Sequence, residues 1–144
     1  MLNKVNEFLK DSSPVIIGVS TNKNAWGNEL FRLFFKNGYK PIPISRSCNE
    51  IEGIRTFASI DDLPQQSLNL IFSIPPKETE KILLDAEKGK IKSAWFVFGS
   101  KPNNISQIAA EKDIEIIYGY CPMMFLNRKG IHRFHYLIKS WFSS

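Results

Sequence analysis

The residues best suited to bind a ligand lie where a β-branched run, residues 15–19, is followed by a polar loop. Gly18 and Ser20 lie at this boundary, and a helical pattern begins at Trp26. Small residues let a ligand approach the backbone, and a serine hydroxyl at a strand end can donate to a phosphate oxygen. A dinucleotide fingerprint needs G-x-G-x-x-G, whereas here Gly18 is followed only by Gly27, after a longer loop. The segment indicates either a phosphate site or a plain turn between strand and helix.

Arg46 is the second candidate. It follows Ser45 at the end of an extended segment, residues 39–44. In NAD-binding Rossmann domains the second strand ends in an acidic residue that accepts from the ribose hydroxyls, whereas a phosphorylated ribose calls for a cation. A guanidinium pairs bidentately with phosphate. Arg46 therefore indicates either a phosphorylated adenosine ligand, with coenzyme A and NADP as candidates, or a solvated surface arginine.

Cys121 is the one candidate for a reactive side chain. It follows the last predicted strand and precedes Pro122, and a ligand thiol could reach it there. A lowered thiol pKa would need a cation or a helix N-terminus beside it, and none can be placed from the sequence. Packing is the favoured interpretation. Cys48, in a polar loop beside Arg46, is expected to be the more exposed of the two cysteines.

The remaining catalytic signals are weak. His132 and His135 lie three residues apart in a segment with an apolar stripe, without a nearby carboxylate or cysteine, so we favour a structural or partner-facing role over a metal site. Asp61 and Asp62 are interpreted as a solvated pair beside a short helical turn, in which Ser59 has capping spacing. No nucleophile elbow, zinc motif or Walker motif is present, so we expect no catalytic residues and no metal.

Composition limits the possible partners. The chain has 144 residues and a net charge of +5, but its lysines and arginines never form a block of five. This scatter argues against nucleic-acid binding and favours a small anionic ligand. No apolar run could cross a bilayer and no signal peptide is recognisable. Two cysteines fit a reducing compartment, so a cytoplasmic protein is expected.

The pattern along the chain alternates between strands and helices. After an N-terminal helix near residues 2–10, the predicted strands cover residues 15–19, 39–44, 68–74, 94–98 and 114–118, with helices between most of them. Such alternation predicts an α/β, Rossmann-like, doubly wound parallel sheet of about five strands. We divide the chain into an N-terminal helix (1–13), the Rossmann-like domain (14–122) and a C-terminal extension with an amphipathic helix (123–144).

Two local features refine this picture. Pro41 and Pro43 share a parity, so their missing donors face the same side, which suits a strand fully bonded on only one side. Pro75 and Pro76 open a helix that carries Glu78 near its positive end. Ligands of such sheets bind beyond the carboxyl ends of the strands. The segments 20–28, 45–48, 73–77, 99–102 and 119–124 are therefore predicted to surround the site.

Five short segments also carry a family resemblance. Residues 15–20, 38–44, 71–76, 95–99 and 120–122 resemble, in order, the small stand-alone CoA-binding domain proteins, Rossmann-like relatives of the CoA-binding domain of succinyl-CoA synthetase. The resemblance implies CoA in the crevice, with its phosphates near Gly18 and Ser20 and its adenosine between the ends of strands two and three. Departures lie in the first loop, residues 23–27, and at Ser45-Arg46, where the family often has other residues. Phosphate contact is then expected to move to Lys23 and Arg46, unless affinity is lost.

The resulting hypothesis is a CoA-binding or acyl-CoA-binding protein without evident catalysis. The alternatives are an NADP-dependent oxidoreductase-like domain and a protein-interaction module that has lost its ligand. The C-terminal helix is a candidate for homo-oligomer formation, because an apolar stripe on it needs a cover. The predicted ligand-binding residues are Gly18, Val19, Ser20, Lys23, Asn24, Trp26, Ser45, Arg46, Ser73, Ile74, Pro75, Gly99 and Cys121.

Overall fold

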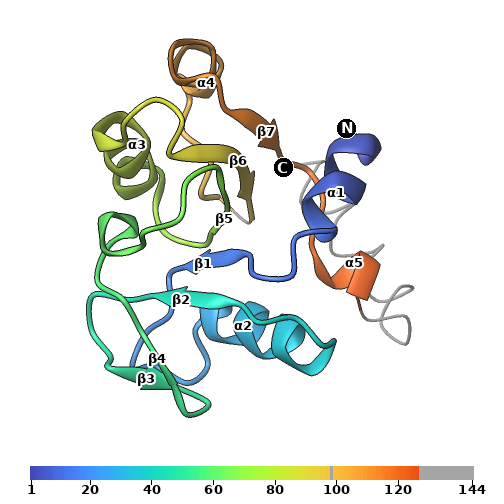
Figure 1. Ribbon diagram of the computed structural model, residues 1–144, viewed down its shortest axis with the longest axis vertical. Coiled ribbons are helices and arrows are strands. Elements are labelled where there is room, and N and C mark those ends of the chain that lie inside the picture. The colour runs from blue at the N-terminus through green and yellow to red at the C-terminus, as the bar shows by residue number, and fades with distance from the viewer. Residues whose placement is uncertain (98, 127–144) are drawn as a thin grey trace.

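A sheet of five parallel strands runs through the centre of the fold (Figure 1). The computed structural model describes residues 1–97 and 99–126. The strand order is β2-β1-β5-β6-β7. These strands are β1 (Val15–Ile17), β2 (Ile42–Ile44), β5 (Leu68–Phe72), β6 (Ile91–Phe96) and β7 (Glu115–Ile117). The predicted Rossmann-like α/β class is confirmed, whereas the C-terminal amphipathic helix, with His132 and His135, lies outside the described residues.

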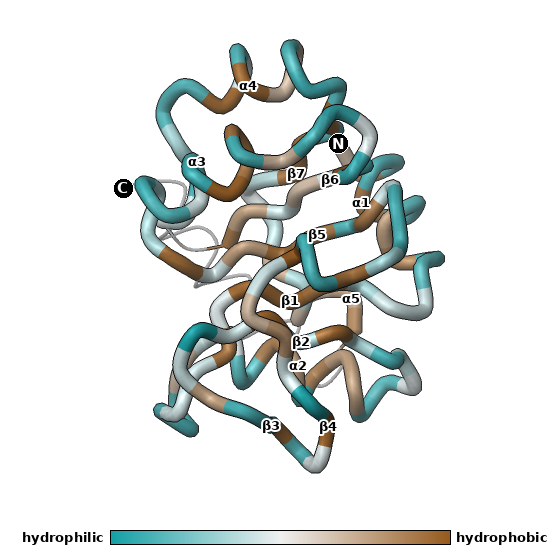
Figure 2. Tube along the Cα trace, turned by 60° about the vertical axis from the view of Figure 1, so that its left-hand side comes forward, coloured by the Kyte–Doolittle hydropathy of each residue, from teal (hydrophilic) through white to brown (hydrophobic). Residues whose placement is uncertain are grey.

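Helices cover both faces of this sheet. Figure 1 shows α3 (Pro76–Asp85) and α4 (Ile105–Lys112) on one side of the strands. The other side carries α1 (Leu2–Leu9), α2 (Trp26–Lys36) and the short α5 (Met123–Leu126), which share one apolar cluster with the strands. In Figure 2 the apolar segments concentrate in the central strands, while the hydrophilic ones lie in the outer turns. Two cores, one per face, therefore hold the layers together.

The N-terminal helix is built into the second of these cores. Val5 is fully buried and Phe8 nearly so. The Phe8 ring meets Trp95 of β6 edge-on, with the centroids 5.2 Å apart. Trp95 in turn donates its indole N–H to the carbonyl of Tyr120 at 2.8 Å. Aromatic contacts of this kind tie α1 and the segment after β7 to the same strand.

The edge position of β2 confirms the interpretation of its prolines. On its inner side Ile42 donates its N–H to the carbonyl of Pro14 at 2.9 Å. Pro43 has no N–H to offer on the outer side, but its carbonyl accepts from Phe57 at 2.9 Å. The proline thus sits where a ladder donor is not required.

Two short elements follow β2, and the sequence revealed only one of them. Residues 50–55, for which the sequence indicates no regular element, form the hairpin β3 (Glu50–Ile51) and β4 (Ile54–Arg55). Its turn residues Glu52 and Gly53 have φ values of 50° and 78°, as a two-residue hairpin turn requires. The expected helical turn is the 3-10 helix η1 (Ile60–Asp62), whose N-cap Ser59 accepts from Asp61 N–H at 3.1 Å.

No helix within residues 1–97 and 99–126 combines the length and the apolar character needed to cross a membrane.

Candidate ligand-binding site

A pocket lies where the strand order switches direction. β1 pairs with β2 on one side and with β5 on the other, so the chain turns outward after β1 and later returns past it. A pocket of about 380 Å³ opens beyond these strand ends, bordered by residues 17–20, 44–47 and 58–61 and by α3. This is the place where open α/β sheets bind ligands.

The floor of the pocket is the backbone of Gly18. Its φ of +119° suits glycine, and a Cβ there would clash with the hydroxyl of Ser73. Ser73 is held in place because both its backbone N–H and its hydroxyl donate to the carbonyl of Ile17, each at 3.0 Å. The ends of β1 and β5 are therefore tied together, and glycine at position 18 leaves room for the Ser73 hydroxyl that ties them.

The N-terminus of α2 rests directly on this floor. Gly27, in the first turn of α2, lies so close to the carbonyl of Gly18 that a Cβ on Gly27 would overlap it. In dinucleotide-binding folds the third glycine of the fingerprint allows the same close packing of helix and strand. Gly27 thus fills that role although its spacing differs from the fingerprint.

Asn28 fixes the polar loop over the start of α2. Its Oδ1 accepts from the backbone N–H of Ser20 at 2.8 Å, and its Nδ2 donates to the Ser20 carbonyl at 2.9 Å. The Ser20 hydroxyl also accepts from the N–H of Asn22 at 2.9 Å. Asn28 is 4% exposed, so this pairing is sheltered from water. Ser20 is therefore held by the protein itself through its backbone N–H, which is not free for a phosphate.

Arg46 projects from the end of β2 towards α3. Its Nη2 lies 2.9 Å from Oε1 of Glu78, and the two side chains are 73% and 43% exposed. The sequence located Glu78 only as an acidic residue near the positive end of a helix. The fold brings it across the pocket mouth to the arginine predicted to bind phosphate.

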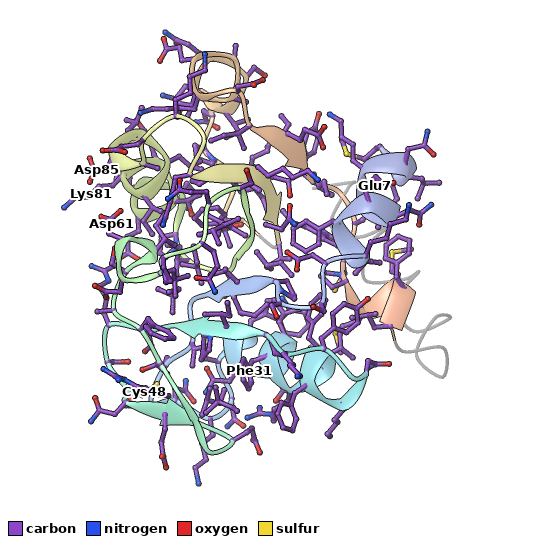
Figure 3. All side chains as sticks on the ribbon, viewed as in Figure 1. Glu7, Phe31, Cys48, Asp61, Lys81 and Asp85 are labelled. Atoms are coloured by element: carbon purple, nitrogen blue, oxygen red, sulfur yellow. The ribbon has the colours of Figure 1, made fainter. Side chains whose placement is uncertain are left out.

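The pocket combines an apolar interior with a charged rim. Isoleucines dominate the interior, which includes Ile17, Val19, Ile44, Ile60, Ile74 and Ile82. The charged side chains along the rim are Arg46, Asp61, Glu78, Lys81 and Asp85. Figure 3 shows Asp61, Lys81 and Asp85 gathered beside one another between η1 and α3. Two cations against three carboxylates leave this rim without the positive excess that the whole chain carries.

The structure brings about half of the predicted site residues to the pocket. Its lining includes Gly18, Val19, Ser20, Ser45, Arg46 and Ile74, and Ser73 lies directly beneath Gly18. The remaining predicted residues are not part of the lining, namely Lys23, Asn24, Trp26, Pro75, Gly99 and Cys121.

Sequence reasoning missed the contribution of α3. Glu78, Lys81, Ile82 and Asp85 all face the pocket. Their spacings of three and four residues place them on one side of a helix. That periodicity could have identified a shared face, but not what the face covers.

The two cysteines differ in accessibility, as expected. Cys121 is fully buried, and this burial raises the pKa of its thiol to about 11. It is therefore a neutral, poorly nucleophilic thiol at pH 7. Cys48 is partly exposed, beside the β3–β4 hairpin in Figure 3, and its thiol lies 3.3 Å from the hydroxyl of Ser45. The packing interpretation of Cys121 agrees with this geometry.

Metal ligands do not gather in the part of the chain that the structure describes. Within it, no group of three or more histidine, cysteine, aspartate or glutamate side chains is placed to hold an ion.

Fold and pocket together define a small Rossmann-like α/β domain with a ligand pocket at its switch point. A family model described as a CoA binding domain matches residues 12–127. The chain therefore belongs to the CoA-binding domain family. A comparison with curated proteins finds no match.

Several solved structures share the fold. A conserved hypothetical protein from Pyrococcus furiosus is 24% identical, with a TM-score of 0.71 over 79% of this chain and 97% of that one. A hypothetical protein from Pyrococcus horikoshii OT3 is 21% identical, with a TM-score of 0.73 over 85% of this chain and 87% of that one. The dinucleotide forming acetyl-coenzyme A synthetase 1 from Ca. Korarchaeum cryptofilum, in complex with phosphate and ADP, is 19% identical. Its TM-score is 0.65, over 76% of this chain and 26% of that one.

Proposed function

We propose that this protein binds coenzyme A or an acyl-CoA in the switch-point pocket and has no catalytic activity of its own. The observation that carries the proposal is the pocket itself, with a glycine floor at the end of β1 and an isoleucine-rich interior bordered by β2 and α3. Its volume of about 380 Å³ falls in the range of roughly 300–1,000 Å³ that small-molecule sites occupy. Membership of the CoA-binding domain family supports the same ligand.

The parts of the ligand match different parts of the site. The adenine ring would lie among the isoleucines, because a flat, weakly polar ring gains from leaving water. The pyrophosphate would lie over the backbone of Gly18, against which the first turn of α2 packs. Arg46 is the cation at the end of β2 that could bind a ribose phosphate, although Glu78 already binds it.

Binding without catalysis agrees with the side chains at hand. Cys121 is buried with its pKa raised to about 11, so it offers no thiolate at neutral pH. Both cysteines are free thiols, which supports a reducing, cytoplasmic location. The acidic residues at the rim line the entrance of the pocket together with Arg46 and Lys81.

Two experiments test the proposal. Native mass spectrometry of the purified chain should detect a retained CoA or acyl-CoA. Calorimetric titration with CoA, dephospho-CoA, NADP and NAD should then give binding for the CoA compounds and weaker or no binding for the nicotinamide nucleotides. Tighter binding of NADP than of CoA would favour an oxidoreductase-like domain. No binding of any nucleotide would favour an interaction module.

A further inference from the structure

Glu78 and its partner Arg46 belong to elements of different kinds, a helix and a loop. Glu78 belongs to the first turn of α3, where a carboxylate is favoured by the helix dipole. Thr79, the next residue, is fully buried and donates its hydroxyl to the carbonyl of Pro75 at 3.2 Å, which anchors this turn. Arg46 stands in the loop after β2 and is 73% exposed. The ion pair thus joins an exposed side chain in the loop after β2 to the first turn of α3.

This pairing changes what a ribose phosphate would gain at the site. A phosphate that binds Arg46 must displace Glu78 or share the guanidinium with it at a distance of a few ångströms. At that distance the phosphate and the Glu78 carboxylate repel each other. Arg46 also gives up its ion pair with Glu78 to the extent that it binds the phosphate. A ligand without the ribose phosphate leaves the ion pair intact and avoids both costs.

We propose that Glu78 is a specificity-determining residue, which holds Arg46 and thereby removes most of the site's preference for a phosphorylated ribose. This inference rests on the proposed CoA-binding function. The site then accepts dephospho-CoA nearly as well as CoA. Arg46 binds the ribose phosphate, and Glu78 determines how much affinity this contact adds.

The test is the ratio of two dissociation constants, dephospho-CoA over CoA, measured by calorimetry on the full chain. For the wild type the ratio should lie within about twofold of one. The contact that Arg46 gains with the phosphate is nearly balanced by the ion pair that it loses with Glu78. Glu78→Gln should raise the ratio about three- to fivefold by tightening CoA alone, since it removes the competing charge. Arg46→Ala should leave the ratio near one, and the double variant should behave like Arg46→Ala.

Glu80→Gln is the matched control. Glu80 lies on the same helix, but its carboxylate accepts from Asn104, the N-cap residue of α4, with 3.4 Å between Oε1 and Nδ2. This substitution removes the same charge from α3 and should leave the ratio at the wild-type value. Equal ratios in Glu78→Gln and Glu80→Gln, with both nucleotides still bound, would overturn the role of Glu78 but not the proposed function. If the wild type binds neither nucleotide, the proposed function is overturned as well.

Discussion

The carbonyl of Gly18 at the end of β1 packs against Gly27 in the first turn of α2, with no room for a Cβ between them. This contact brings the helix N-terminus to the floor of the pocket. It also explains why the loop between them, residues 19–26, can depart from a dinucleotide fingerprint. The backbone contact is kept while the loop residues vary.

Substitution at this contact should destabilise the fold. Alanine is favoured over glycine in a helix by about 1 kcal/mol, but an added methyl group at Gly27 would overlap the Gly18 carbonyl. Because overpacking typically costs about 1–3 kcal/mol, we expect Gly27→Ala to lower the free energy of unfolding by up to about 2 kcal/mol net. Urea denaturation followed by circular dichroism measures this change.

Gly38→Ala is the control for that measurement. Gly38 follows α2 with a φ of +87° and has open space around its Cα, so alanine there meets backbone strain without a clash. The cost should be about 1 kcal/mol, with unchanged CoA affinity. If Gly27→Ala were more stable than the wild type, the close packing of α2 on β1 would be contradicted.

Asn28 should couple the loop to ligand affinity. Asn28→Ala removes both bonds to the Ser20 backbone and leaves polar groups in a largely buried place. We expect the free energy of unfolding to fall by about 1–3 kcal/mol. The CoA dissociation constant should also rise, because Ser20 lines the pocket. Denaturation and calorimetry measure the two effects. A loss of stability with unchanged CoA affinity would contradict a contribution of this loop to ligand binding.

The strands and the residues that follow them could be predicted because short sequence patterns indicate them. The β-branched run at residues 15–19 and the apolar run at residues 94–98 indicated strands, and glycine, serine and arginine after the strands indicated one edge of the sheet. The geometry confirms that Gly18 and Arg46 border the same pocket.

The other features depend on distances that no sequence pattern states. The Arg46–Glu78 ion pair joins a loop to a helix 32 positions later in the chain. The hydrogen bonds of Asn28 turn back over a loop of irregular shape. The β3–β4 hairpin left one sign, a glutamate and a glycine between two isoleucines, which is a two-residue turn with glycine in its second position.

Cys121 predicts a pH dependence of stability. Its pKa is raised from 9.0 to about 11 because burial disfavours the thiolate. The folded state therefore favours the neutral thiol, and this contribution is complete below pH 9 and is lost as the pH rises towards 11. The stability difference between the wild type and Cys121→Ala should shrink by about 1.4 kcal/mol between pH 8 and pH 10.

Paired denaturation curves of the two proteins at pH 7, 8, 9 and 10 measure this difference. The pKa of Tyr39 is also raised by burial, but Tyr39 is present in both proteins and cancels in the comparison. A difference that stays constant up to pH 10 would show that Cys121 is accessible to water.

If CoA occupies the pocket between β2, η1 and α3, a side chain that fills this pocket must weaken its binding. Ala58 is exposed and borders the pocket, so Ala58→Phe should place a phenyl ring in it without disturbing the core. Ala110 is an exposed alanine on α4 outside the lining, so Ala110→Phe is the matched control. In calorimetric titrations with CoA, we expect Ala58→Phe to lose at least roughly tenfold in affinity, about 1.4 kcal/mol, and Ala110→Phe to lose none. Equal CoA affinity of Ala58→Phe and the wild type, with both proteins folded, would contradict binding at this pocket.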